Sequence, residues 1–442
     1  MKKITVCIVS MLLAAGAYAL PHYELAYRLS GAGAIMLPDG KVDPFIKRPI
    51  MGGQFAVEFL PTGRWHCLQQ WNNASIGVGV SYLNLGNAAK LGSAFAAYGY
   101  MNQPFYNGEH FRIGVRPTIG LAAVTKTYRN TLPEGVSPYT TAHDKNRNLI
   151  ANWSIGSILN AYLAFELFLD FPITSGWEVT MTGGWHHISN GSVMHPNAGY
   201  NFIGGELGLR YNPDLRGVTR GFRGRMPKTD VPHRLYDGVD KKWALEFSTS
   251  ASFKQNYYAD NQNKQQFFGA ATIKVAAYWV PLSIFRIGGG FDAFYDGYYA
   301  CVNSHVPGAK EANPNALVTY FEKTYLKESN KANCFRVGFS IQPELIIGNL
   351  TAGVHVGFYL YDPVKNLEPF KEAQEADQRG ESLHRGIFYG YDFTKASNYQ
   401  DGWCYMHFVL KYHVLSHMFV QLGMKTHGVR AEFIDAGIGV AF

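Results

Sequence analysis

The sequence contains a histidine and a serine whose spacing could support ester hydrolysis. His187 and Ser189 lie two residues apart in the segment Trp-His-His-Ile-Ser-Asn-Gly, residues 185–191. In an extended strand, residues two apart point to the same side, with Cα atoms about 7 Å apart. Where the strand end bends, an imidazole at that distance can reach a serine hydroxyl and activate it as a nucleophile. The pair therefore predicts a nucleophile and its general base.

The residues around this pair alternate as expected for a membrane strand. Apolar residues fall on one face and polar residues on the other: Trp177, Val179, Met181 and Trp185 against Glu178, Thr180, Thr182 and His186. His187 and Ser189 continue the apolar face, which would contact lipid. We therefore expect the pair to point outward at the membrane interface, while His186 is a hydrogen-bonded interior histidine. A lipid-cleaving enzyme would need this placement.

Similar alternation recurs along the chain and predicts a membrane barrel. Examples are the segments 22–29, 53–60, 75–82, 111–120, 162–171 and 177–189. Aromatic residues make up 15% of the sequence, and the last strand-like segment ends in a terminal phenylalanine, Phe442, as is typical of outer-membrane barrels. No run of about 20 apolar residues follows the N-terminal segment, which excludes a transmembrane helix. The predicted fold class is all-β, an antiparallel transmembrane β-barrel of about 16 strands, with a secreted soluble β protein as the alternative.

The chain divides into four predicted regions. Two lysines, an apolar run and Ala17-Tyr18-Ala19 predict a signal peptide over residues 1–19, cleaved after Ala19. Residues 20–212 and 243–442 form two barrel halves. Between them, the proline-containing and basic residues 213–242 predict a linker or a periplasmic turn. We expect the mature protein in the outer membrane of a Gram-negative bacterium, in contact with its lipid.

The two halves are predicted to be related by duplication. Residues 432–442 align without gaps on residues 201–211, with matching aliphatic, Phe, Ile and Gly positions. When Gly184 is laid on Gly423, Thr426 takes the place of His187 and no serine follows. We therefore expect the second half to be non-catalytic. The break after Tyr211 favours two small barrels, whereas duplication within one sheet favours a single wide one.

Four cysteines remain after the predicted signal, in an oxidising compartment. Cys301 and Cys334 bracket a polar stretch, so we predict a disulfide that closes a long loop. No cysteine or histidine spacing resembles a zinc or redox site, and we predict no cofactor. The formal charge of +7 is weak evidence for contact with anionic lipid. We expect no nucleic-acid partner for an exported protein, and nothing in the sequence indicates the oligomeric state.

The residues after the pair carry a family resemblance. A His-x-Ser-Asn motif at a strand end, a short turn with Pro196-Asn197-Ala198-Gly199 and a final apolar strand resemble the lipid A 3-O-deacylase (PagL) family. These outer-membrane barrels hydrolyse an ester-linked acyl chain of lipopolysaccharide. The resemblance implies lipid A as substrate, Ser189 as nucleophile and His187 as base. It also implies that Asn197 and the turn amides near Asn190 and Gly191 are oxyanion donors.

One position departs from the family pattern. The acidic residue that orients the histidine falls at Asn201 here. An amide can orient the base, but it stabilises the imidazolium less than a carboxylate does. Glu206 has the opposite parity and should pair with Arg210 inside the barrel. Glu432, equivalent to Asn201 in the second half, could help only if the two halves met in space.

Two alternatives to a lipid A deacylase stay open. One is a non-enzymatic porin or scaffold that kept the fold but lost the acid. The other is a hydrolase of phospholipid esters.

Overall fold

The structure is a computed structural model of the full chain. It describes residues 25–39, 42–60, 63–134, 151–174, 176–194, 196–213, 243–255, 267–297, 334–362, 404–428 and 430–442. The predicted signal peptide and most of the predicted linker lie outside these residues, as does Cys301. The disulfide between Cys301 and Cys334 therefore stays a prediction.

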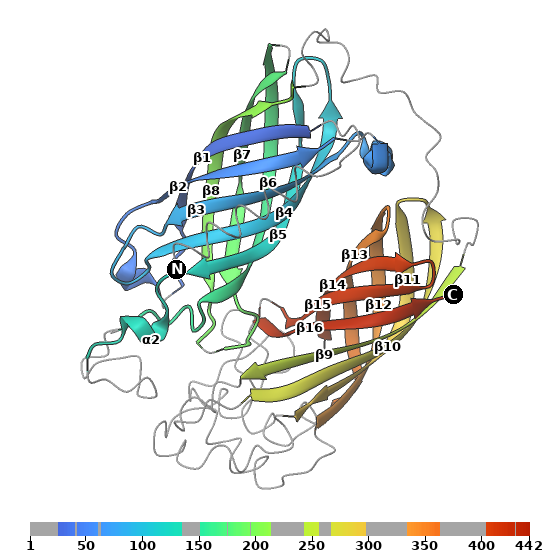
Figure 1. Ribbon diagram of the computed structural model, residues 1–442. Helices are drawn as coiled ribbons and strands as arrows, with labels where there is room; N and C mark the ends of the chain where they lie inside the picture. Colours follow the sequence, from blue (N-terminus) through green and yellow to red (C-terminus); the bar gives the residue numbers. More distant parts are fainter. Residues whose placement is uncertain are drawn as a thin grey trace, which may run out of the picture.

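The first half forms a closed antiparallel barrel of eight strands (Figure 1). Its strands are β1 (Leu25–Met36), β2 (Ile50–Phe59), β3 (Ser75–Asn84), β4 (Ser93–Asn107), β5 (Arg112–Val124), β6 (Leu159–Thr174), β7 (Trp177–Ser189) and β8 (Tyr200–Tyr211). The barrel closes because β8 pairs with β1, from Tyr211 opposite Tyr27 to Phe202 opposite Met36. Within the described parts of its connections lie three short helical segments: η1 (Asp43–Phe45), η2 (Gly63–Trp71) and α2 (Tyr128–Thr131).

The second half forms another closed barrel of eight strands. These are β9 (Trp243–Gln255), β10 (Phe267–Leu282), β11 (Phe285–Asp296), β12 (Phe335–Ile347), β13 (Leu350–Tyr361), β14 (Cys404–Leu415), β15 (Met418–His427) and β16 (Arg430–Ala441). The last strand pairs with the first, from Ala436 opposite Ala251 to Ala441 opposite Glu246. The predicted fold of about 16 strands in two halves is confirmed, and the halves close separately.

Side chains fill the interior of each barrel, as an eight-stranded barrel is just wide enough for them to do. An apolar cluster that includes Ile50 and Phe202 occupies part of the first barrel, and buried ion pairs lie inside both barrels. In the first barrel the Arg210 guanidinium donates to Glu58 (2.6 Å) and Glu178 (3.0 Å). In the second, Glu344 accepts hydrogen bonds from Arg286 (2.7 Å) and Lys411 (2.7 Å). Packed interiors of this kind do not match the wide polar lumen that a porin requires.

One predicted interior contact is wrong. Glu206 does face the interior, but it accepts a hydrogen bond from Arg28 (3.3 Å) instead of pairing with Arg210. Two residues four apart on one strand lie about 13 Å apart, whereas neighbours on adjacent strands lie about 5 Å apart. Each interior charge therefore finds its partner on another strand.

The outer walls of both barrels expose large apolar side chains. Leu29, Leu207, Phe253 and Ile438 are among those more than half exposed. Such a surface suits a lipid environment. Among the described residues, no helix has the length and apolar character to cross a membrane.

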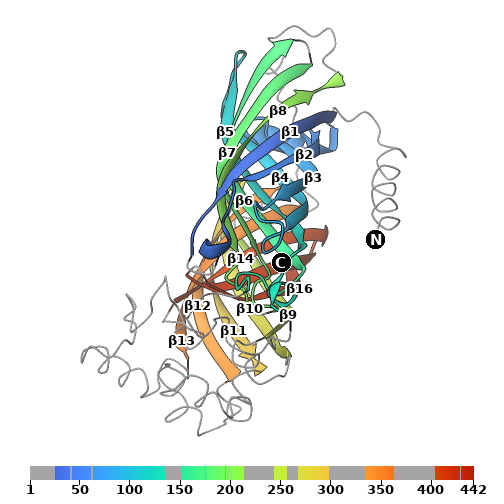
Figure 2. The same ribbon diagram turned by 90° about the vertical axis from the view of Figure 1, so that its left-hand side faces the viewer.

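The two barrels lie beside each other (Figures 1 and 2), and hydrogen bonds join them at both ends. At one end, Trp71 of η2 donates its indole N–H to the Ile346 carbonyl (3.3 Å), and Ser283 donates to Gln70 (3.1 Å). At the other end, the β7–β8 connection contacts the end of β9 and the start of β16. At the first end the connections that meet follow even-numbered strands in both barrels, and at the second end they follow odd-numbered strands. Both barrels therefore cross the membrane in the same direction.

Candidate active site

The candidate pair lies at the end of β7, on the outer wall of the first barrel. The odd-numbered residues of β7 face outward: Trp177, Met181 and Trp185 are 40 to 44% exposed, while Glu178 and Thr180 are buried inside. His187 and Ser189 continue this outward series. Ser189 is nevertheless only 6% exposed, because neighbouring segments cover it.

Three side chains form a hydrogen-bonded chain. His187 Nδ1 lies 2.8 Å from Asn201 Oδ1, and His187 Nε2 lies 2.7 Å from Ser189 Oγ. A carbonyl oxygen can only accept, so Nδ1 carries the proton and donates it to Asn201. Nε2 then has its lone pair toward Ser189 and accepts from the hydroxyl. This is the tautomer that a general base needs.

Strand register places Asn201 in this chain. β7 and β8 are antiparallel neighbours, and His187 lies directly opposite Asn201. Directly opposed side chains on one sheet face have Cβ atoms about 5 Å apart, within reach of a hydrogen bond. On the other side of the ring, Trp185 stacks on His187 with centroids 5.5 Å apart and planes 15° apart. Asn201 therefore holds the imidazole by a hydrogen bond in the plane of the ring, and Trp185 packs against its face.

Gly199 leaves room for the pair. Its φ is +79°, and a Cβ at this position would lie 2.8 Å from His187 Cε1 and 3.1 Å from Ser189 Cβ. The Gly199 N–H donates to the Ser154 carbonyl (2.9 Å). Glycine is thus required both by the backbone conformation and by close approach of the two side chains. The sequence motif contained this residue but gave it no role.

The connection after β7 begins with a tight turn. Val193 N donates to the Asn190 carbonyl (3.2 Å), and Gly191 and Ser192 have φ of +61° and +68°. Positive φ at both central residues defines a type I′ turn. The Asn190 amide donates to Asn197 Oδ1 (2.8 Å), which ties the start of the connection to its end. Neither the Gly191 N–H nor the Asn197 side-chain NH₂ has a hydrogen-bond acceptor among the described residues.

A segment before β6 supports the turn, and sequence reasoning missed it. Asn190 Nδ2 donates to Ser157 Oγ (2.7 Å) and to the Met194 carbonyl (2.7 Å). Ser157 Oγ in turn donates to Asn160 Oδ1 (2.9 Å). Ile155 forms an isolated antiparallel bridge with Asn197. The end of the β5–β6 connection therefore packs over the candidate site.

The two carboxylates weighed as replacements for the family's acid point elsewhere. Glu206 lies inside the first barrel, bound to Arg28. Glu432 lies inside the second barrel, where Lys425 and Arg336 donate to it. Asn201 is the residue that accepts the hydrogen bond from His187 Nδ1.

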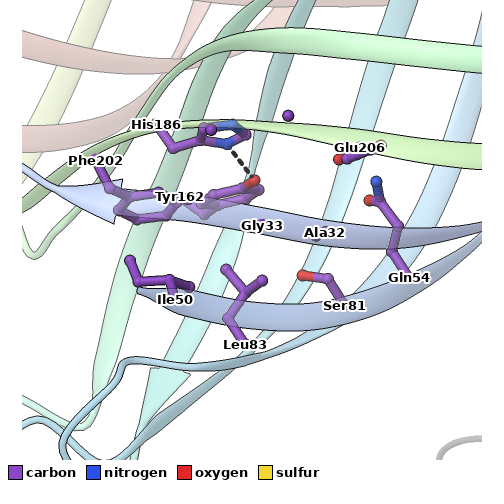
Figure 3. Close-up of a pocket in the computed structure, with 13 residues that line it drawn as sticks. Ala32, Gly33, Ile50, Gln54, Ser81, Leu83, Tyr162, His186, Phe202 and Glu206 are labelled. Carbon is purple, nitrogen blue, oxygen red and sulfur yellow. Dashed lines mark hydrogen bonds between the residues drawn. The ribbon is translucent and has the colours of Figure 1, made fainter. Parts of the chain in front are cut away.

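His186 faces the barrel interior, as its parity predicts. Its Nδ1 lies 2.9 Å from the Tyr162 hydroxyl, and both line a small cavity with Gln54, Ser81 and Glu206 (Figure 3). The cavity lies on the opposite face of β7 from His187 and Ser189, so it is separate from the candidate pair. Among the described residues, no group of three or more His, Cys, Asp or Glu side chains could hold a metal ion.

Comparisons with solved structures returned other barrels. The outer membrane enzyme PagL is 16% identical and aligns over 42% of this chain and 98% of its own, with a TM-score of 0.24. Neisserial surface protein A is 9% identical over 43% of this chain and 97% of its own, with a TM-score of 0.27. A mutant porin of Rh. blastica is 10% identical over 95% of this chain and 100% of its own, with a TM-score of 0.15. No curated protein matched the sequence.

Family models match most of the chain. Residues 54–210 match the model described as lipid A 3-O-deacylase (PagL). Residues 243–371 and 383–442 match the model described as acyloxyacyl hydrolase, C-terminal domain. The matches follow the two barrels, and the family and fold together indicate the Gram-negative outer membrane. The chain therefore belongs to the PagL-like acyloxyacyl hydrolase family of outer-membrane barrels.

Proposed function

We propose that this protein removes an ester-linked acyl chain from lipid A, with Ser189 as nucleophile and His187 as general base. The observation that carries the proposal is the hydrogen-bonded chain from Asn201 through His187 to Ser189 on the lipid-facing wall. A nucleophile, a base and a group that orients the base are the parts that acyl transfer requires. The family supplies the substrate class.

The reaction proceeds through an acyl-enzyme. Nε2 of His187 takes the Ser189 hydroxyl proton as Oγ attacks the ester carbonyl carbon. The tetrahedral intermediate collapses, the bond to the sugar oxygen breaks, and that oxygen leaves with the proton from His187. Water then attacks the acyl-enzyme, giving one proton to His187, and the fatty acid is released as Ser189 is regenerated.

Asn201 orients the base in this scheme. Its oxygen accepts the Nδ1 proton and keeps Nε2 unprotonated toward Ser189. A neutral amide stabilises the imidazolium less than a carboxylate would, so the proposed enzyme is slower than one with an acid at this position.

The oxyanion would be stabilised by two donors that have no acceptor among the described residues. These are the Gly191 N–H and the Asn197 side-chain NH₂, near the end of β7. Asn190 was also expected here, but its amide and side chain are already bonded within the connection. We therefore assign Asn190 to holding the turn.

The position in the membrane fits a lipid substrate. Outer-membrane barrels have their longer connections on the extracellular side, and the candidate site lies at the end that carries the connections after odd-numbered strands. That side faces the leaflet that contains lipopolysaccharide. An outward-facing nucleophile can then meet an ester near the headgroup level.

The test is mass spectrometry of lipid A from cells with and without the protein. We expect loss of one acyl chain with the wild type and no loss with Ser189→Ala or His187→Ala, each still inserted in the membrane. Ser93→Ala is the matched control, because Ser93 is an outward-facing serine at the same end of β4. Deacylation by Ser189→Ala would refute the mechanism. Release of fatty acid only from phospholipid would show that the substrate is a phospholipid and not lipid A.

A further inference from the structure

The second barrel contacts the turn that carries the candidate oxyanion donor. Ser192 Oγ donates to the Ala431 carbonyl of β16 (2.7 Å), and the Gln255 N–H of β9 donates to the Ser192 carbonyl (3.2 Å). The side chain of Ile434 packs so closely on Gly191 that a Cβ there would overlap it. Three residues of the second barrel thus contact two consecutive residues of the turn.

These contacts come from the seam where the second barrel closes. β9 and β16 are its first and last strands, and they pair with each other. Ile434 lies on the outer face of β16, while its neighbours Phe433 and Asp435 are buried inside. The apolar wall of the second barrel therefore meets the site, and its interior does not.

The contacted residues have a conformation that needs support. Ser192 has φ of +68°, a region that residues other than glycine, asparagine and aspartate adopt at a cost of about 1 kcal/mol or more. The hydrogen bond that closes the turn is long, at 3.2 Å. The bonds to Ala431 and Gln255 stabilise Ser192 in this conformation. The direction of the Gly191 N–H depends on the same turn.

We infer that the second barrel is a positioning element of the active site: β9 and β16 hold Gly191 and Ser192 so that the Gly191 amide is presented to the ester oxygen. This inference rests on the proposed deacylase function. It gives the second barrel, predicted to be non-catalytic, a role in the reaction. The contacts of Trp71 and Gln70 at the far end keep the two barrels in the orientation that this contact needs.

The first experiment compares two substitutions of Ser192 in the full chain. Both remove the hydroxyl that bonds Ala431, but Ser192→Ala keeps the cost of positive φ, whereas Ser192→Gly removes it. We expect Ser192→Ala to lower kcat about tenfold with KM unchanged, because an oxyanion donor acts on the transition state. Ser192→Gly should stay within about threefold of wild type. Wild-type kcat in Ser192→Ala would overturn the inference.

The second experiment tests the partner barrel. Ile434→Ala removes the contact with Gly191, and Ile438→Ala is the control on the same outward face of β16, more than half exposed. We expect Ile434→Ala to lower kcat several-fold and Ile438→Ala to leave it unchanged. Hydrogen exchange of the peptide containing residues 190–194 should accelerate only in Ile434→Ala. Equal exchange in both variants would also refute the positioning role.

The two proposals can fail separately. If the wild type shows no deacylation that depends on Ser189, the proposed function fails, and the exchange measurement still decides whether the second barrel holds the turn. If deacylation depends on Ser189 but neither Ile434→Ala nor Ser192→Ala changes kcat, the function stands and the positioning role falls.

Discussion

At the scale of single residues, the candidate site depends on which face of β7 each residue occupies and on one glycine. Parity along β7 puts His187 and Ser189 on the lipid-facing side, and this followed from the alternation of the sequence. Register across to β8 adds Asn201. Gly199 could not be assigned from the sequence, because its role arises from a return of the chain onto His187 and Ser189 that no local pattern specifies.

Asn201 is the residue at which a gain of activity is expected. Asn201→Asp preserves the size of the side chain and its 2.8 Å contact with Nδ1, and adds a negative charge that stabilises the imidazolium. We expect kcat to rise at least about tenfold, measured as fatty acid released from purified lipid A. Asn201→Ala should lower it. An unchanged rate in both variants would show that another group orients His187.

Gly199 gives a steric prediction. Gly199→Ala would bring a methyl group against His187 Cε1 and force an alanine to adopt φ of +79°. We expect deacylation to fall by about a hundredfold, because a displacement of about 1 Å at a catalytic group has effects of that size. The control is Gly31→Ala, since nothing lies within 4 Å of a Cβ there. If both alanine variants retain full activity, the close approach is not limiting.

At the scale of elements, the sequence predicted strands well where large apolar residues alternate with polar ones. The predicted strand 177–189 coincides with β7. The predicted segment 22–29 covers only part of β1, which continues to Met36 through Gly31, Ala32, Gly33 and Ala34. Small residues offer no contrast in hydrophobicity between the two faces, so the alternation disappears although the strand continues.

The segment before β6 gives a prediction at this scale. Ser157→Ala removes one of the two acceptors of the Asn190 side chain and loosens the turn without touching the candidate pair. A hydrogen bond of this kind contributes about 1 kcal/mol, so we expect a loss of about fivefold in kcat. In a double-mutant cycle with Asn190→Ala, the effect of Ser157→Ala should largely disappear. Full additivity would mean that Ser157 acts by another route.

At the scale of the whole molecule, the number of barrels could not be read from the sequence. Strands that close a small barrel and strands that extend a wide one have the same alternation, because only the pairing partner differs. In the structure β8 pairs with β1 over ten positions and not with β9. That choice depends on contacts between residues 166 to 184 positions apart, from Met36 with Phe202 to Tyr27 with Tyr211. The duplication could be recognised from a local alignment of the two halves, but the strand pairing that closes each barrel could not.

Separate closure predicts separate unfolding. Each barrel has its own buried ionic network, centred on Glu58 in the first and on Glu344 in the second. Glu344→Gln leaves the cationic Arg286 and Lys411 with one fewer buried counter-ion, which typically costs about 3–5 kcal/mol. Among the described residues the barrels contact each other only at their two ends, and we do not expect such contacts to spread that loss to the other barrel.

We therefore expect each substitution to destabilise only its own barrel. In denaturant titrations of the protein in lipid vesicles, hydrogen exchange of peptides from each barrel reports the two midpoints separately. Glu344→Gln should lower the midpoint of the second barrel, and Glu58→Gln that of the first. A parallel shift of both midpoints in either variant would show one cooperative unit. In that case the second barrel would influence the β7–β8 turn through the stability of the whole molecule and not through the local contact of Ile434.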